Sequence, residues 1–229
     1  MKSIGLIGGM SYESTVTYYN TINNHINNML GEHHSAKILL YSVDFEEIYV
    51  NIQNKDWKKA ANILIDAAVK LENGGVDFIL ICTNTLHMVF DIVQQSVHVP
   101  FLHIADALIN SLNKDNLNNI LLLGTKTTMT QPFYVDKLLQ AGITVILPSD
   151  EEMIQLDNII FNELCKGEIN AESKNILISI INNAQKKGAQ ACVLGCTELG
   201  LIISKNDISL PVYDTAIIHS ITAASMALL

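Results

Sequence analysis

Two short apolar runs constrain the fold of this chain more than any other feature. A cluster of small polar residues follows each run. The runs are Phe78–Ile81 and Ala191–Leu194, and turn residues bound both of them. A run that is apolar throughout predicts a strand covered on both faces, which is typical of a parallel sheet between helices. Ligands of such sheets bind beyond the carboxyl ends of the strands. The polar clusters therefore mark the place where we expect chemistry.

The two runs also resemble each other residue by residue. Residues 75–86 align without a gap on residues 188–199, and this alignment pairs Thr83 with Cys196. Two further pairs follow in the same order and at nearly the same spacing, namely Ile4–Gly8 with Ile120–Gly124 and Val99–Leu102 with Leu210–Tyr213. We therefore predict an α/β fold of two similar lobes with parallel sheets, related by a pseudo-twofold, with the active site in the cleft between them.

The length of 229 residues suits two lobes of ordinary domain size. We expect one lobe to comprise residues 1–98 with 211–229, and the other to comprise residues 99–210. Hydrophobic residues make up 49% of the chain and charged residues 16%, so both lobes can bury a core. No low-complexity linker separates them.

The charge pattern argues against a nucleic-acid partner. The net charge is −9, and all 14 basic residues are lysines. Nucleic-acid surfaces need clustered Lys and Arg. Without arginine, no bidentate guanidinium can bind a substrate carboxylate, so backbone N–H groups, hydroxyls, amides or a lysine must do so.

The cysteines and the apolar segments indicate the compartment. The spacing of the four cysteines does not match a zinc site. The apolar start at Ile4–Ile7 is too short for a signal peptide, and no run approaches the length of a membrane span. We expect free thiols, a cytoplasmic protein and no membrane partner.

Apolar periodicity and turn residues predict the remaining elements. Strands are expected at 3–8, 37–43, 78–81, 99–103, 119–124, 143–147, 191–194 and 211–213. Helices are expected from Ser11 onward and at 58–73, 86–97, 105–113, 127–141, 149–165, 172–187 and 216–229. The polar segment 45–57 is expected to be a loop or a short helix.

Two facing lobes with one reactive group each suit the transfer of a proton from one face of a carbon to the other. A partly desolvated cysteine thiol has a tunable pKa and can remove or return a Cα proton. The carbanion must spread onto the adjacent carboxylate, which hydroxyls, amides and backbone N–H groups would stabilise. Side chains placed to supply such groups are those of Asn84, Thr85, Thr125, Thr127 and Thr197.

An ordered set of motifs spans nearly the whole chain. The motifs are Gly5–Ser14, Cys82–His87, His103–Asp106, Leu123–Thr125, Leu194–Leu199 and Pro211–Thr215. Together they resemble the aspartate/glutamate racemase family. The resemblance implies two Rossmann-like lobes and a two-base racemisation of acidic amino acids that needs no cofactor and no metal.

The resemblance also implies roles for single residues. Cys196 would be the second catalytic residue and Thr83 would occupy the first catalytic position. Substrate contacts would map to Met10, Ser11, Asn84, Thr85, Thr125, Thr197 and Glu198. Most members of the family have cysteine where this chain has Thr83. A subgroup with threonine there is associated with broader or one-handed activity. A threonine hydroxyl can donate a proton but is a poor base, so we expect the two directions to be unequal.

Several neighbouring residues keep alternative interpretations. Cys82 could replace Thr83 after a shift of one residue, but adjacent strand side chains face opposite ways, so we expect a structural role. His87 could orient a ligand or simply pack, and Glu198 could bind the substrate ammonium, assist Cys196 or cap a helix. Lys166 is a candidate for the distal carboxylate of the substrate, although a lysine near a helix C-terminus is a common structural feature.

Two other functional classes stay open at this stage. The fold is shared, by family resemblance, with decarboxylases of malonate-like acids and with maleate isomerases, and a site with one cysteine would suit a decarboxylase. A non-catalytic amino-acid-binding protein is the other class. A homodimer is common in the family, and the preferred amino acid and its handedness are not predicted.

Overall fold

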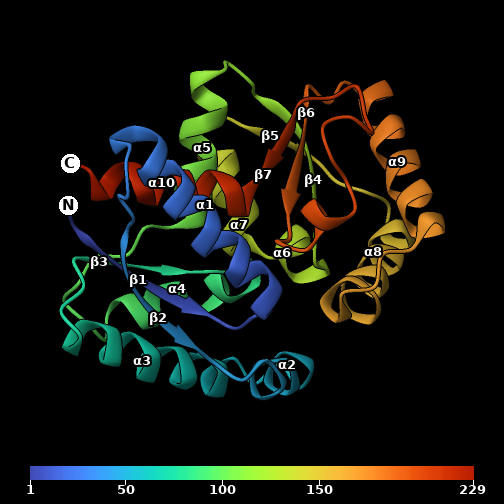
Figure 1. Cartoon of the computed structure of the whole chain (residues 1–229). Coiled ribbons are helices and arrows are strands. Elements are labelled where there is room, and N and C mark those ends of the chain that lie inside the picture. The colour runs from blue at the N-terminus through green and yellow to red at the C-terminus, as the bar shows by residue number, and fades with distance from the viewer. The chain divides into compact units, whose positions relative to one another are not determined.

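The computed structural model describes residues 1–229, the whole of the sequence. Contacts divide the chain into two compact units. The first unit comprises Met1–Ala107 with Ala216–Leu229, and the second comprises Leu108–Thr215. Both are α/β units built on a parallel sheet (Figure 1), as the sequence predicts.

The first unit contains a three-stranded sheet in the order β2-β1-β3. Parallel pairing sets Ile4 of β1 opposite Phe78 of β3, and Ile7 opposite Ile81. The elements in chain order are β1 (Ser3–Gly8), α1 (Tyr12–Leu30), β2 (Lys37–Ser42), α2 (Phe45–Gln53), α3 (Trp57–Asn73), β3 (Phe78–Ile81), the 3₁₀ helix η1 (Thr85–Val89), α4 (Phe90–Gln94), α5 (Ile104–Lys114) and, from the end of the chain, α10 (Thr215–Ala227).

Helices cover both faces of this sheet. Ile79 and Ile81 face a cluster with α3, whereas Phe78, Leu80 and Cys82 face a cluster with α1 and α10. The alternation is the period of two that a strand imposes on its side chains. It explains why β3 is apolar throughout, and it buries Cys82 completely, as its predicted structural role requires.

The second unit repeats this strand order and adds one strand, giving β5-β4-β6-β7. Ile120 of β4 lies opposite Ala191 of β6, and Gly124 lies opposite Gly195. The elements are β4 (Asn119–Gly124), α6 (Lys126–Thr130), α7 (Pro132–Gln140), β5 (Thr144–Ile146), α8 (Asp150–Asn162), η2 (Leu164–Lys166), α9 (Ala171–Lys186), β6 (Ala191–Gly195), η3 (Leu199–Leu201) and β7 (Val212–Asp214).

The boundaries of the units differ from those predicted. Residues 99–107 belong to the first unit, because Phe101 forms a bridge with Ile79 and the Pro100 carbonyl accepts from Ile79 N–H. Residues 211–215 belong to the second unit, because β7 pairs with β6. The helix after each of these segments, α5 or α10, then continues into the other unit.

Four predicted elements also differ in form. The helix predicted over 149–165 is divided into α8 and η2. The segment 99–103 makes a single bridge instead of a strand. The helix predicted over 127–141 is interrupted at Gln131, whose backbone is extended because the following Pro132 disfavours a helical conformation there. The helix predicted over 86–97 is divided into η1 and α4.

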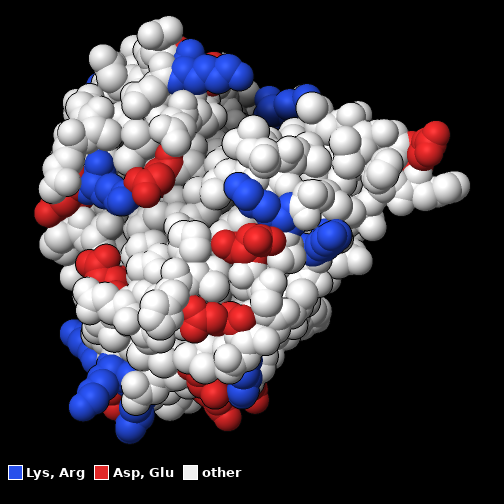
Figure 2. Space-filling view, turned by 90° about the vertical axis from the view of Figure 1, so that its left-hand side faces the viewer, with Lys and Arg blue, Asp and Glu red and all other residues white.

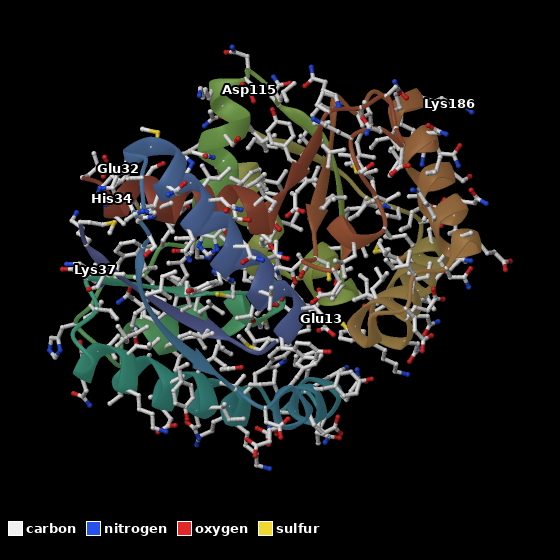
Figure 3. All side chains as sticks on the ribbon, viewed as in Figure 1. Glu13, Glu32, His34, Lys37, Asp115 and Lys186 are labelled. Carbon is white, nitrogen blue, oxygen red and sulfur yellow. The ribbon has the colours of Figure 1, made fainter.

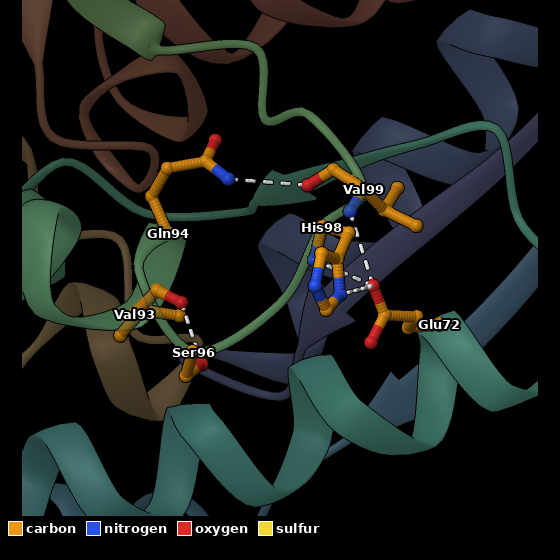
Figure 4. A network of polar contacts seen from close by, with 6 residues as sticks. All are labelled: Glu72, Val93, Gln94, Ser96, His98 and Val99. Atoms are coloured by element: carbon orange, nitrogen blue, oxygen red, sulfur yellow. Dashed lines mark hydrogen bonds and ion pairs between the residues drawn. The ribbon is translucent and has the colours of Figure 1, made fainter.

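Side-chain hydrogen bonds hold residues 98–101, in the connection between α4 and α5, in place (Figure 4). The Glu72 carboxylate accepts from the backbone N–H groups of His98 and Val99 at 2.6 and 3.1 Å. Gln94 donates to the Val99 carbonyl and accepts from Phe101 N–H at 2.8 Å. These contacts fix the stretch that leads to His103 without needing a regular strand.

Charges are spread over the surface of the chain. On the face drawn in Figure 2, lysines and acidic residues are interspersed among uncharged residues. Figure 3 shows Lys37 at the start of β2 and Lys186 at the end of α9, on different units. None of the helices combines the length and apolar composition needed to cross a lipid bilayer.

Two buried tyrosines, one in α1 and one in α7, differ in the hydrogen bonding of their hydroxyls. Tyr18 and Tyr134 are both completely buried, but the Tyr18 hydroxyl lies 2.9 Å from Nδ1 of His219, whereas the Tyr134 hydroxyl has no partner. Tyr18→Phe should cost about 1–3 kcal/mol because it leaves a buried ring nitrogen unsatisfied. Tyr134→Phe should be neutral or stabilising. Urea denaturation followed by circular dichroism measures both, and equal losses would contradict this assignment.

Candidate functional site

In the first unit, the polar residues of interest follow β1 and β3. The two strands are adjacent and parallel, and Cys82 N–H donates to the Ile7 carbonyl at 2.9 Å. Their carboxyl ends therefore meet at one edge of the sheet. Residues Gly8–Ser11 leave β1 at this edge, and Thr83–Thr85 leave β3 there. The candidate residues at this edge are all buried: Met10, Ser11, Thr83, Asn84 and Thr85.

Hydrogen bonds within the turn after β1 fix its shape. The Ser11 side chain caps α1 by accepting from Ser14 N–H. The Thr15 hydroxyl donates to the Ser11 carbonyl and accepts from Gly9 N–H, both at 2.8 Å. Gly9 has a φ of +92°, and a Cβ there would overlap the Val43 carbonyl, so glycine is required. Glu13 lies in the first turn of α1 (Figure 3).

Sequence reasoning did not identify Thr15 as part of this turn. The available signal was a hydroxyl residue four positions after the capping Ser11, which is one helical turn. Such a spacing also occurs in ordinary helices, so it carries little information without the turn geometry.

In the second unit, the candidate residues follow β4 and β6. These strands come close at their ends, because Cβ atoms at Gly124 and Gly195 would each lie 2.9 Å from a carbonyl oxygen of the neighbouring strand. Thr125 then caps α6 by accepting from Thr128 N–H. Cys196, Thr197 and Glu198 leave β6 at the same edge and are all buried.

One carboxylate oxygen organises the residues after β6. Oε2 of Glu198 accepts from the Cys196 thiol at 3.0 Å and from the Thr197 hydroxyl at 2.8 Å. The Glu198 side chain is only 3% exposed, so both hydrogen bonds are shielded from water. A buried carboxylate bound to a thiol can accept the thiol proton. This contact favours the interpretation in which Glu198 assists Cys196.

The surroundings of Cys196 raise the pKa of its thiol well above the ordinary value. Burial is the largest cause, and the negative charge of Glu198 and the neighbouring Cys165 act in the same direction. The resting sulfur is therefore a thiol that donates to a carboxylate.

The other cysteines differ from Cys196. Burial alone raises the pKa values of the Cys82 and Cys192 thiols, that of Cys192 to about 12. Cys82 directly follows β3, and Cys192 lies within β6. The place of Cys165 late in the helix expected at 149–165 favours a core residue, but Cys165 lies in η2 and is partly exposed.

The remaining candidates, Thr127 and Lys166, are less buried than Cys196, Thr197 and Glu198. Thr127 is partly buried in α6, and its carbonyl accepts from Gln131 N–H at 3.0 Å. Lys166 is exposed at the end of η2, where Gly167 takes a left-handed conformation. Lys166 directly follows Cys165, which lies close enough to Cys196 to raise the pKa of its thiol. Lys166 is thus on a segment near the Cys196 turn.

His87 and His219 have clear structural contacts. Nδ1 of His87 lies 2.8 Å from the Thr83 carbonyl, and the Nε2 atom accepts from Ile104 N–H at 3.2 Å. His219 contacts the Tyr18 hydroxyl and the Leu102 carbonyl, both at 2.9 Å.

Comparison with known proteins places these features in a family context. The family model described as Asp/Glu/hydantoin racemase matches residues 7–223. A curated relative, the broad specificity amino-acid racemase RacX of Bacillus subtilis, is 25% identical over 218 residues, which cover 93% of this chain and 92% of that protein.

Solved structures are similar over the full length. A candidate Asp/Glu racemase from Yersinia pestis is 44% identical, with a TM-score of 0.92 and 100% of each chain covered. An aspartate racemase homologue from Pyrococcus horikoshii OT3 is 38% identical, with a TM-score of 0.84 and the same coverage.

The contact between Cys196 and Glu198 predicts a specific change in thiol reactivity. Glu198→Gln removes the negative charge, so the pKa of Cys196 should fall by about one unit or more. The pH profile of Cys196 alkylation by iodoacetamide, measured by mass spectrometry of the peptide, reports this shift. Glu168→Gln, at an exposed position, is the control with the same change in net charge. An unchanged or upward-shifted profile in Glu198→Gln would refute the contact.

Proposed function

Because this chain belongs to the Asp/Glu/hydantoin racemase family, whose matched relatives are named as racemases and therefore as isomerases, we propose that it racemises a free amino acid. Aspartate and glutamate are the proposed substrates. The observation that carries the proposal is the buried thiol of Cys196, bound to the Glu198 carboxylate directly after a parallel strand.

In the proposed reaction, Cys196 and Thr83 act on opposite faces of the substrate Cα. Glu198 accepts the thiol proton, and the thiolate removes the Cα proton. The electron pair left on Cα spreads onto the substrate carboxylate as a carbanion. The Thr83 hydroxyl supplies a proton to the other face, directly or as a relay, and takes a replacement proton from water. Glu198 gives the proton it accepted back to water, so all three groups regain their starting protonation.

The protonation state of Cys196 supports unequal directions. Its raised pKa favours the thiol, which can give a proton without prior activation. Removal of a proton requires that Glu198 first accept the thiol proton, and Thr83 is a poor base by its chemistry. The direction in which Cys196 acts as the acid should therefore be limited by the weak base on the other face.

The remaining site residues have proposed binding roles. Hydroxyl, amide and backbone N–H groups would bind the substrate carboxylate and stabilise the carbanion. We assign this role to Met10, Ser11, Asn84, Thr85, Thr125, Thr127 and Thr197. Their support is that they follow strands β1, β3, β4 and β6 at the carboxyl edges of the two sheets.

The proposal also covers the oligomeric state and the cellular compartment of the protein. We propose a cytoplasmic homodimer that uses no pyridoxal phosphate. Exposed apolar side chains on one side of α1 support a further protein contact: Tyr12, Val16 and Tyr19 are 69, 55 and 51% exposed at helical spacing. The four free cysteines suit a reducing compartment.

Hydrogen exchange at Cα tests the proposed chemistry. L- and D-amino acids incubated in deuterated buffer should gain deuterium, as followed by proton NMR. Cys196→Ala should lower the rate by about 10²-fold or more, because a general base contributes that much. Thr83→Val should lower the rate, whereas Thr83→Ser should retain most of it because the hydroxyl is kept.

Three outcomes would contradict the proposal. Normal deuterium uptake in Cys196→Ala would exclude the thiol as the acid–base group. Release of CO2 instead of a change in optical rotation would indicate a decarboxylase. Binding of aspartate without any Cα exchange in the wild-type protein would indicate a binding protein.

Lys166 is the proposed contact for the distal carboxylate of an acidic substrate. Its position on the segment next to Cys165 supports this role, and the chain has no arginine to replace it. Lys166→Ala should raise KM for glutamate far more than KM for a neutral amino acid. Lys187→Ala, at an exposed lysine directly after α9, is the matched control. Equal effects of Lys166→Ala on both substrates would refute the role.

A further inference from the structure

Three buried histidines lie next to one another in the first unit, and the proposed reaction uses none of them. The cluster consists of His87, His103 and His219, which are 2, 7 and 0% exposed. The ring centroids of His87 and His103 are 4.5 Å apart, and those of His87 and His219 are 6.2 Å apart. Buried imidazoles are costly to place without hydrogen bonds, so their partners indicate what they do.

The hydrogen bonds of His87 determine its tautomer. The Ile104 backbone N–H can only donate, so Nε2 of His87 is the acceptor at 3.2 Å. In a neutral ring the hydrogen is then on Nδ1, which donates to the Thr83 carbonyl at 2.8 Å. Burial, with His103 and His219 nearby, lowers the pKa of His87 well below its ordinary value, which agrees with a neutral ring.

The two contacts join separate parts of the unit. Thr83 lies two residues after the end of β3, and Ile104 is the first residue of α5. Stacking on Phe90, with ring centroids 5.5 Å apart and planes 8° apart, holds the imidazole in its orientation. A rigid ring therefore spans the distance between the Thr83 carbonyl and the α5 N-terminus.

The other two histidines fix the neighbouring segment. A carbonyl can only accept, so Nε2 of His219 donates to Leu102, and Nδ1 accepts from the Tyr18 hydroxyl. Nδ1 of His103 accepts from Ala105 N–H at 3.0 Å. Both ring nitrogens of His87 and of His219 are thus occupied by protein partners. Neither ring has a lone pair available for a metal ion.

The second unit has no equivalent of this arrangement. The residue four positions after Cys196 is Gly200, whereas His87 is four positions after Thr83. A Cβ at Gly200 would overlap the Asp214 carboxylate. Cys196 is instead contacted by its own neighbour, Glu198. An imidazole at this position is therefore specific to the turn that carries Thr83.

We propose that His87 is a positioning residue, which holds the Thr83 carbonyl through its Nδ1–H. The contact fixes the backbone of Thr83 and therefore the direction in which its hydroxyl side chain extends. This inference rests on the proposed racemase function. A small displacement of a catalytic group lowers the reaction rate more than it weakens substrate binding. Loss of the contact should therefore lower kcat and leave KM nearly unchanged.

Two substitutions separate the two hydrogen bonds of His87. In asparagine, the amide nitrogen lies two bonds from Cβ, as Nδ1 does in histidine, so His87→Asn can keep the donor to Thr83. In glutamine, the amide oxygen lies three bonds from Cβ, as Nε2 does, so His87→Gln can keep the acceptor for Ile104. Both replace a buried ring by an amide, so each controls for loss of packing in the other.

The test measures Cα exchange kinetics and thermal stability of the two variants. His87→Gln should lose about 10-fold or more in kcat with KM little changed, whereas His87→Asn should stay within about threefold of wild type. Both variants should lose similar amounts of thermal stability. Equal kcat values in two folded variants, or a lower kcat in His87→Asn, would overturn the proposal.

A second measurement does not depend on activity. The ¹⁵N shifts of His87 in histidine-labelled wild-type protein should show Nδ1 protonated and Nε2 unprotonated between about pH 5 and pH 8, where free histidine titrates. The opposite tautomer, or a charged ring, would refute the contact with Thr83. If the tautomer is as expected but the wild-type protein exchanges no Cα hydrogen, the racemase function fails and the hydrogen bond stands.

Discussion

The parallel pairing of β1 with β3, and of β4 with β6, is the constraint on which the rest of the structure depends. Parallel strands end at the same edge, so the turns after paired strands must meet there. Backbone hydrogen bonds set the register, and glycines at 124 and 195 allow β4 and β6 to come close at these ends. Helices on both faces of the first sheet account for the fully apolar sequence of β3, which leaves polar chemistry to the turn after it.

The two units place different side chains in the turns after β3 and β6. The turn after β6 places a thiol against a carboxylate, with the thiol and a neighbouring hydroxyl both donating to one oxygen of Glu198. The turn after β3 places a threonine whose carbonyl contacts a neutral imidazole. The first arrangement can pass a proton from sulfur to oxygen, and the second can only hold its residue in place. This difference is the physical basis for the proposed inequality between the two directions of the reaction.

Much of this organisation could be predicted from the sequence, and particular residues show where prediction stops. Uninterrupted apolar runs identified β3 and β6, and strand alternation correctly assigned Cys82 to the core. The unit boundaries were misplaced, because only strand pairing reveals that Phe101 joins Ile79 and that β7 joins β6. The break at Gln131 reflects its Pro132 neighbour. The roles of His87 and Thr15 depend on contacts with backbone groups, which no side-chain pattern encodes.

In the proposed reaction two different groups transfer the Cα proton, one on each face. The most direct test uses a single enantiomer in deuterated buffer and follows isotope content before equilibrium is reached. If Cys196 and Thr83 act separately, the newly formed enantiomer carries deuterium while the unreacted enantiomer keeps its protium. If the starting enantiomer gains deuterium as fast as its mirror image appears, one group serves both faces and the central claim is contradicted.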